Sequence, residues 1–456
     1  MTANSAVAGY RPEKMMIRIG SGFRIIDDEE QPVEIPTANA FGVFLHEYFH
    51  YVHNISAATG LTGFINTLEI WRLFRTTIDE TGYSAGHNKL SENYHKHYTT
   101  LHKLFHAIRT VHKPKLKENF KPTSIEISSA EEPIETVGDT TGTLLSAINC
   151  QAKVEDDHGA SECHTIKVGV QEIMEAAAWL LERRYVNQSD PNASPLPAEV
   201  FPYQVVRALV DYKLDNADDD SILACILAAL HSTNPPEALM GILELAKAAE
   251  NDDKSVFDAV HMAVKDTVDS NETQLIDQLD NIEKEFCGDS IMAVGIRTIT
   301  SRARTALQLR SLEPLFEIAF VDLLSNKEVS IGNIMNKIPA CNVLQENSGS
   351  IEDLRRDFLV SFSPISGDNW DPEVGLRVIH VIFDFMLGHI SENGFLTTNQ
   401  LPPKRCPFYT TCDLPLRKKY SAICGKTPWK SVEWDGWGQS GKCDYATAIA
   451  ITRPPI

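Results

Sequence analysis

The residues most suited to chemistry are His46-Glu47-Tyr48-Phe49-His50, which form an H-E-x-x-H pattern. In a helix, histidines four residues apart lie on one face, so both imidazoles can reach the same ion. The glutamate between them then lies beside that ion and can take a proton from a metal-bound water. The pattern predicts a Zn²⁺ site with His46 and His50 as ligands and Glu47 as general base.

The residues around this motif have the pattern of an amphipathic helix. Thr37 or Asn39 can cap its start, and Gly60 offers a stop. Apolar side chains recur at steps of three and four and form one stripe: Phe41, Leu45, Tyr48, Val52 and Ile55. The two histidines fall at the edge of this stripe, where a buried site can be lined. The alternative is that both are surface or hydrogen-bonded core histidines.

A catalytic zinc usually has three protein ligands and keeps a fourth position for water. Residues 169–183 predict a second helix, with alanines in the middle and arginine in the last turn. Glu172 and Glu175 lie one turn apart beside its apolar face, and Glu182 follows. A bound cation would compensate a carboxylate placed near the core. His53, on the first helix, is a further candidate ligand.

The segment Glu175-Ala-Ala-Ala178-Trp-Leu-Leu-Glu182 resembles the Glu-x-x-Ala-x-x-x-Glu pattern of the aminopeptidase branch of the gluzincin metallopeptidases. In that family a glutamate on a second helix completes the site that H-E-x-x-H begins. The resemblance covers two short helices. It implies a zinc peptidase in which Glu175 joins the two motif histidines as a ligand and Glu47 is the base. The connection between the helices is longer here, which implies a large insertion. Glu172 and then His53 stay open as alternative third ligands.

Composition limits the class of protein. The chain has 456 residues, of which 43% are hydrophobic and 23% charged, as in ordinary globular proteins. Its formal net charge of −20 opposes binding to nucleic acid or anionic membranes, which carry charge of the same sign. The first ten residues do not resemble a signal peptide, and no apolar run approaches membrane-spanning length. Nine cysteines in such a chain suggest reduced thiols or metal ligands, and we expect a cytoplasmic protein.

Short strands are predicted before the metal helix, at 16–20, 23–26 and 32–36. In zincin-type peptidases an edge strand beside that helix holds the substrate backbone as an added strand, and 20–26 is the candidate here. Later strand-like pieces at 143–154 and 164–168 flank a polar loop, to which we assign His158, Cys163 and His164 without a metal role. Between these regions lie predicted helices at 64–78 and 91–111. The second carries His95, His102 and His106 on one face, which we interpret as a solvated polar face.

The rest of the chain predicts an α+β, mostly α-helical fold. Residues 187–197 are polar and rich in proline, which is typical of a linker. Helical patterns follow, at 200–214, 221–231, 236–249, 255–269, 272–286, 290–309 and 370–390. Asp218 and the acids after it predict a capped helix start. We therefore expect a zincin-like domain over 1–190, a helical domain over 198–400 and a Cys- and Trp-rich segment over 401–456.

The last segment contains four of the nine cysteines, Cys406, Cys412, Cys424 and Cys443, among prolines and tryptophans. Four thiols in an irregular, reduced segment could form a second zinc site that replaces a missing core. Their spacing is not that of paired C-x-x-C knuckles. The alternative is four ordinary buried cysteines.

The function that these patterns favour is zinc-dependent hydrolysis of a protein or peptide substrate. The helical remainder is larger than this chemistry needs, so we expect it to select a protein substrate or to restrain the site until a regulatory partner binds. Two alternatives stay open. H-E-x-x-H also occurs in other metal-dependent amide hydrolases such as deformylases. A non-enzymatic helical interaction protein with a structural metal, or with structural histidines, would also fit.

Overall fold

The fold is mostly helical, as predicted. The computed structural model describes residues 8–13, 15–26, 36–138, 144–286, 291–325, 341–347, 358–361, 372–412, 414–433 and 443–453. It is 60% helical, with fourteen α-helices and a few small sheets in these ranges. The α+β, mostly α-helical class is therefore confirmed. The predicted strand at 32–36 lies outside the described residues except for Pro36.

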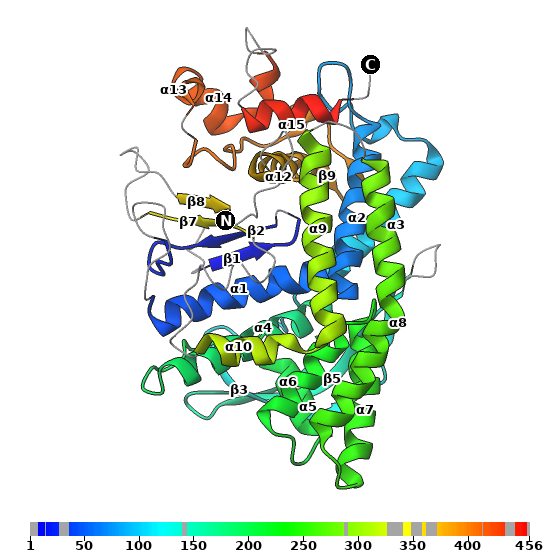
Figure 1. The fold of residues 1–456 in the computed structure, drawn as a ribbon, viewed down its shortest axis with the longest axis vertical. Helices are drawn as coiled ribbons and strands as arrows, with labels where there is room; N and C mark the ends of the chain where they lie inside the picture. Colours follow the sequence, from blue (N-terminus) through cyan, green and yellow to red (C-terminus); the bar gives the residue numbers. More distant parts are fainter. Residues whose placement is uncertain are drawn as a thin grey trace.

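Helix α1 (Ala38–Ser56) carries the H-E-x-x-H motif and lies at the centre of the molecule, between a sheet and two helices (Figure 1). It begins at Thr37, whose Oγ1 accepts a hydrogen bond from the backbone N–H of Ala40 at 3.1 Å. That confirms Thr37 as the cap. Nearly every side chain of α1 is buried, so the motif lies on a core helix and not on a surface helix.

Gly60 does not end this helix as predicted. Helix α1 ends at Ser56, and α2 (Ala58–Arg75) begins after a corner of one residue, so Gly60 lies in the first turn of α2. A Cβ at this position would lie 2.2 Å from the carbonyl oxygen of His53. Glycine is needed here because the two helices meet too closely for a side chain.

The sheet above α1 combines segments from both ends of the sequence. Its order is β1-β2-β7-β8, with β1 (Ala8–Arg11), β2 (Met16–Ile19), β7 (Asn342–Gln345) and β8 (Phe358–Ser361). Strands β2 and β7 are parallel, and the other pairs are antiparallel. Residues 20–26 form turns and one isolated bridge position, so their prediction as the edge strand is wrong. The edge beside α1 is β1, because β7 occupies the other side of β2.

A second sheet accounts for much of the sequence between α1 and the helix that carries Glu175. It contains β3 (Pro122–Ala130), β4 (Ile134–Gly138), β5 (Leu144–Asp156) and β6 (Ser161–Val168), with β5 pairing to all three others. Both predicted strands are confirmed. Cys163 and His164 lie within β6, so their assignment to the loop is wrong, whereas His158 is in the turn. With α2 and α3 (Glu92–Arg109), this sheet accounts for the long insertion.

Helix α4 (Val170–Ser189) extends into the predicted linker at 187–197. The first helix after the linker begins at Val205, five residues later than predicted. The helices that follow are α5 (Val205–Lys213), α6 (Asp219–Ala229), α7 (Pro235–Asn251), α8 (Val256–Glu285), α9 (Ile291–Leu312), α10 (Phe316–Ser325) and α12 (Pro372–His389). The two helices predicted at 255–269 and 272–286 form the single helix α8. Asp218 caps α6 as predicted, accepting from the N–H of Ser221 at 2.8 Å.

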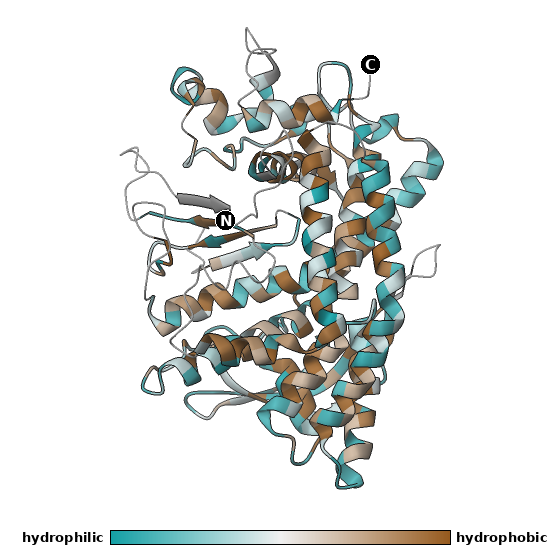
Figure 2. Ribbon diagram, in the orientation of Figure 1, coloured by the Kyte–Doolittle hydropathy of each residue, from teal (hydrophilic) through white to brown (hydrophobic). Residues whose placement is uncertain are grey.

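The helices differ in hydropathy and in how much of their surface packs against other elements. Helices α3 and α8 carry long hydrophilic stretches, whereas α12 is hydrophobic on most sides (Figure 2). Helix α9 packs against α1, α8 and α12, and α10 packs against α4. Apolar contacts therefore run across the boundaries that we predict for three domains, and that division stays a prediction. Among the described residues, no helix combines the length and the apolar character that a membrane crossing needs.

The C-terminal segment lies over α12, at the upper end of the molecule in Figure 1. It contains the short helices α13 (Pro415–Lys419) and α14 (Ser421–Lys426), a 3₁₀ helix (Pro428–Glu433) and α15 (Asp444–Thr452). A short hairpin, β9 (Ile390–Ser391) with β10 (Gly394–Phe395), precedes it.

Candidate metal centre

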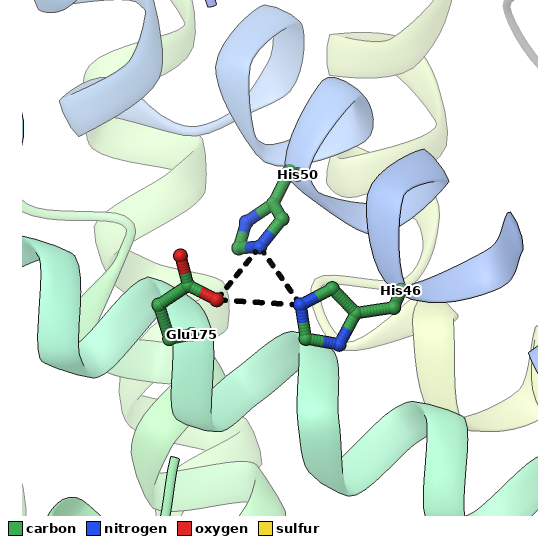
Figure 3. Close-up of side chains that lie close together, drawn as sticks. All are labelled: His46, His50 and Glu175. Atoms are coloured by element: carbon green, nitrogen blue, oxygen red, sulfur yellow. Dashed lines mark hydrogen bonds and ion pairs between the residues drawn. The ribbon is translucent and has the colours of Figure 1, made fainter. Parts of the chain in front are cut away.

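The structure brings His46 and His50 of α1 together with Glu175 of α4 (Figure 3). The two Nε2 atoms are 3.2 Å apart, and each lies 3.3 Å from Oε2 of Glu175. Zinc bonds of about 2.0–2.1 Å in a tetrahedral arrangement place neighbouring donor atoms roughly 3.3 Å apart. The three donors therefore already have the spacing that one ion requires, and a fourth position remains for water.

The close crossing of α1 and α4 makes this spacing possible. Gly42 lies where the helices touch, and a Cβ there would be 2.7 Å from Cγ2 of Val186 and 3.4 Å from Cγ of Glu182. One turn further along α1, His46 faces the same stretch of α4. The two histidines are 7% and 6% exposed, so the site is set into the core.

Two of the three candidate ligands, His46 and Glu175, are oriented by a second contact. The Nδ1–H of His46 donates to Oε2 of Glu182 at 3.0 Å, which leaves Nε2 with a lone pair for a metal. The side-chain amide of Gln171 donates to Oε1 of Glu175 at 2.7 Å, which leaves Oε2 for the metal. Glu182 belongs to the motif found in the sequence, but its orienting role was not assigned. Gln171 was missed, although its position one turn before Glu175 is the signal that identifies it.

We expect Glu182→Ala to weaken zinc binding about 10- to 100-fold, because His46 loses the acceptor that fixes its ring. Glu182→Gln keeps an acceptor without the charge and should weaken binding less. The measurement is the zinc Kd by competition with a chromophoric chelator. Glu69→Ala, on the exposed side of α2, is the control that should leave the Kd unchanged. An unchanged Kd in Glu182→Ala would contradict this role.

The electrostatics of the site also favour a cation. Burial alone would lower the pKa of His46, but hydrogen bonds to Glu175 and Glu182 raise it well above its usual value. Burial alone would raise the pKa of Glu175, yet His50 and His46 hold it well below its usual value. Without a metal, a proton shared among these groups balances part of the carboxylate charge. A divalent cation can replace that proton and satisfy the carboxylates directly.

Glu47 lies next to the three ligands and is held by the sheet edge. Its Oε2 accepts a hydrogen bond from the backbone N–H of Tyr10 in β1 at 2.5 Å. Tyr10 is itself fixed to α1, because its hydroxyl accepts from the side chain of Asn54 at 3.0 Å. Burial raises the pKa of Glu47, and its neighbours His46 and His50 partly offset this effect. The carboxylate is thus half-buried and oriented, and it can exchange a proton.

Two cavities meet at these residues. One of about 430 Å³ and another of about 400 Å³ share Ala8, His46, Glu47 and Tyr203 in their walls. Beyond the shared residues their walls differ: Trp179 and Lys113 line the first cavity, and Arg109 and Gln171 line the second. A larger hollow of about 610 Å³ lies around Arg183 and Arg184 and contains none of the ligands. The candidate ligands and Glu47 therefore line the two smaller cavities.

The alternative third ligands are engaged elsewhere. Glu172 caps the start of α4, accepting from the backbone N–H groups of Gly169 at 2.8 Å and of His112 at 2.5 Å. His53 lies 3.1 Å from Oε1 of Glu317 through its Nε2 atom, on the side of α1 that faces α10. Neither is in the donor cluster, which among the described residues contains His46, His50 and Glu175.

The chain matches no family model, no curated protein and no solved structure in the comparisons made.

The histidines of α3 lie outside the candidate metal centre. His102 and His106 lie 3.0 Å apart on an exposed face, in line with their interpretation as a polar surface.

Proposed function

We propose that this protein is a zinc-dependent metallopeptidase that hydrolyses peptide bonds of a protein or peptide substrate. The observation that carries the proposal is the set of three donors at zinc spacing with Glu47 beside them, where two cavities meet. Zinc, when bound, supplies a Lewis acid that polarises a carbonyl and lowers the pKa of a bound water. His46, His50 and Glu175 would hold it there.

Glu47 would serve as the general base. One of its oxygens, Oε2, is held by the N–H of Tyr10, and the other is left to accept the proton of the attacking water. The same carboxyl would then return the proton to the leaving amine. Because β1 and α1 both fix this side chain, little reorganisation is needed before the reaction.

Tyr203 is the best candidate for stabilising the oxyanion. It lines both cavities, and its ring centroid lies 5.7 Å from that of His46. Burial, with added repulsion from Glu175 and Glu47, raises its pKa well above its usual value. The phenol is therefore protonated at neutral pH and can donate a hydrogen bond to developing negative charge. No pattern in the sequence indicates this role, because Tyr203 lies in an irregular stretch before α5.

The substrate would bind as an extended strand along β1. The N–H of Tyr10 points to Glu47 and thus away from β2, so alternate backbone groups of β1 face the cleft. A peptide can add to such an edge by main-chain hydrogen bonds. A cleft that continues on both sides of the ligands suits an extended chain better than a small formylated amide. A regulatory partner of the helical region stays a prediction from the sequence.

The experiment is to purify the protein without added metal and to measure zinc content and casein hydrolysis together. We expect hydrolysis that a chelator removes and zinc restores. Glu175→Gln should lose zinc from this centre and lose activity. Tyr203→Phe should keep the zinc and lower kcat about 10²- to 10³-fold, with a smaller change in KM. If Glu175→Gln retains its zinc and its activity, the ligand set is wrong. If zinc-loaded protein cleaves formylated amides but no peptide bond, the deformylase-like alternative is correct.

A further inference from the structure

Arg109, the last residue of α3, lies in the wall of a cavity that also contains the candidate metal centre. Of the two cavities that meet there, the one of about 400 Å³ contains all three candidate ligands together with Glu47. That cavity is roughly 9 Å across, which is about the rise of three residues of an extended chain. A peptide held at the centre would therefore bring a neighbouring residue within reach of Arg109.

The guanidinium of Arg109 is fixed in place but only partly satisfied by the protein. Its Nη1 donates to the carbonyl of Phe105 at 3.1 Å, and its Nη2 donates to Oγ1 of Thr67 in α2 at 3.3 Å. The centroid of the Phe105 ring lies 3.9 Å from Cζ. A guanidinium has five N–H groups, and the buried Nε bonds to no described residue. A fixed guanidinium with donors left over is what recognition of a carboxylate requires.

The charge of Arg109 is also incompletely compensated. Its acidic partner among the described residues is Glu13, whose Oε2 lies 3.8 Å from Nε. This separation is too long for a hydrogen bond. The arginine side chain is 17% exposed, and burial lowers its pKa by more than the charge of Glu13 restores. A second carboxylate would compensate the cost of burying this cation.

The end of β1 leads from the metal centre to this arginine. Tyr10 in β1 bonds to Glu47, and residues 11–13 continue along the wall of the same cavity. The contact between Glu13 and Arg109 then joins this wall to α3. A peptide that adds to the edge of β1 would pass Arg109 as it leaves the centre in this direction.

The charges around this cavity favour an anion once Zn²⁺ is bound, because the ion and two arginines outweigh three glutamates. These wall residues are Arg11, Arg109, Glu13, Glu47 and Glu175. The other cavity differs, because its lysine is already paired: Nζ of Lys113 lies 2.8 Å from Oε2 of Glu199. The cavity that contains Arg109 is therefore the better place for a negatively charged group.

We propose that Arg109 binds a carboxylate of the substrate, and so selects peptides that carry one within about three residues of the cleaved bond. This inference rests on the proposed peptidase function and names the substrate class of the same site. The carboxylate belongs to an aspartate or glutamate side chain or to the end of the peptide, and the experiment separates these two sources. Glu13 competes for the same positive charge and moderates the affinity.

The test is the binding of blocked peptides to full-length, zinc-loaded Glu47→Gln, which should hold a peptide without cleaving it. Acetylated and amidated peptides that tile the casein sequence are compared with the same peptides in which amides replace all acids. Fluorescence anisotropy measures each Kd. We expect peptides with an acid in the right position to bind about 10- to 100-fold more tightly than their neutral partners. A chain of net charge −20 would otherwise repel them.

Two further substitutions in this background, with a control, assign the preference to Arg109. Arg109→Gln should remove the difference in Kd, whereas Arg72→Gln, the same change at an exposed arginine of α2, should keep it. Glu13→Gln should widen the difference, because it removes the competing carboxylate. Damage to the fold cannot produce such a gain, so Glu13→Gln decides the matter if Arg109→Gln does not fold.

Neutral peptides with a free C-terminus test the other source of a carboxylate. If these alone bind more tightly, Arg109 recognises the end of the chain. Equal binding of charged and neutral peptides in both series, a preference that survives Arg109→Gln, or no gain in Glu13→Gln would each overturn the proposal. If the preference is found but wild type cleaves no peptide bond, the peptidase function is wrong and the carboxylate site stands.

Discussion

Replacing Glu47 with glutamine should abolish peptide hydrolysis and leave zinc bound. The substitution keeps the size of the side chain and an acceptor for the N–H of Tyr10, but the amide cannot take a proton from water. Loss of a positioned general base typically lowers kcat by about 10² to 10⁴. The measurement is kcat on samples whose zinc content has been determined, so that loss of chemistry is separated from loss of metal.

The matched control is Glu69→Gln, the same chemical change on the exposed side of α2, where Glu69 pairs with Arg72. It should keep both zinc and turnover. Unchanged hydrolysis in Glu47→Gln would remove this residue from the mechanism. Loss of zinc in the same variant would instead make Glu47 part of the ligand set. If no hydrolysis is found in wild type and biological activity survives Glu47→Gln, the non-enzymatic alternative gains support.

Arg310→Met should cause the largest loss of stability, about 3–5 kcal/mol in the free energy of unfolding. Arg310 and Glu317 are 1% and 0% exposed, and the guanidinium donates to both carboxylate oxygens of Glu317. It also donates to Ser56 at the end of α1 and to the carbonyl of Pro314 at 3.0 Å. Methionine fills the space but leaves the Glu317 carboxylate buried without its cation. Urea unfolding of zinc-loaded protein measures the effect.

A second variant separates the cost of an unpaired charge from the cost of altered packing. Arg310→Met with Glu317→Leu removes both charges and should recover most of the lost stability.

The ion pair of Arg310 and Glu317 also predicts that the free energy of unfolding depends on pH. Burial alone would raise the pKa of Glu317, but Arg310 and His53 bring it below its usual value of 4.5. Its contribution is thus complete above pH 4.5 and is lost as pH falls through the lower, folded-state pKa.

The stability difference between wild type and Arg310→Met should therefore shrink in acid. If the double variant is no more stable than the single one, packing and not charge is responsible. This network joins α1 to α9 and α10 at His53 and Ser56. It lies one turn beyond the candidate ligand His50, so the helical region directly supports the helix that carries the candidate site.

Local patterns in the sequence were sufficient for the parts of the site that depend on neighbours along the chain. The 3.6-residue period of a helix places His46, Glu47 and His50 within one turn wherever that helix lies. Caps act within three residues, so Thr37 and Asp218 could be identified in advance. The helical character of most of the chain followed from apolar residues at steps of three and four.

Tertiary structure decided the rest. Glu175 faces the histidines because Gly42 lets α4 cross α1 closely, whereas Glu172, one turn earlier, is used to cap α4. The edge strand is β1 and not 20–26, because β7 from the far end of the sequence pairs with β2. Tyr203 reaches the cleft from an irregular stretch with no periodic signal. The spacing of His46, Glu47 and His50 could be predicted from the chain alone, because a single helix fixes it. Only the packing of distant segments brings Glu175 and Glu182 to these residues and builds the walls of the cleft.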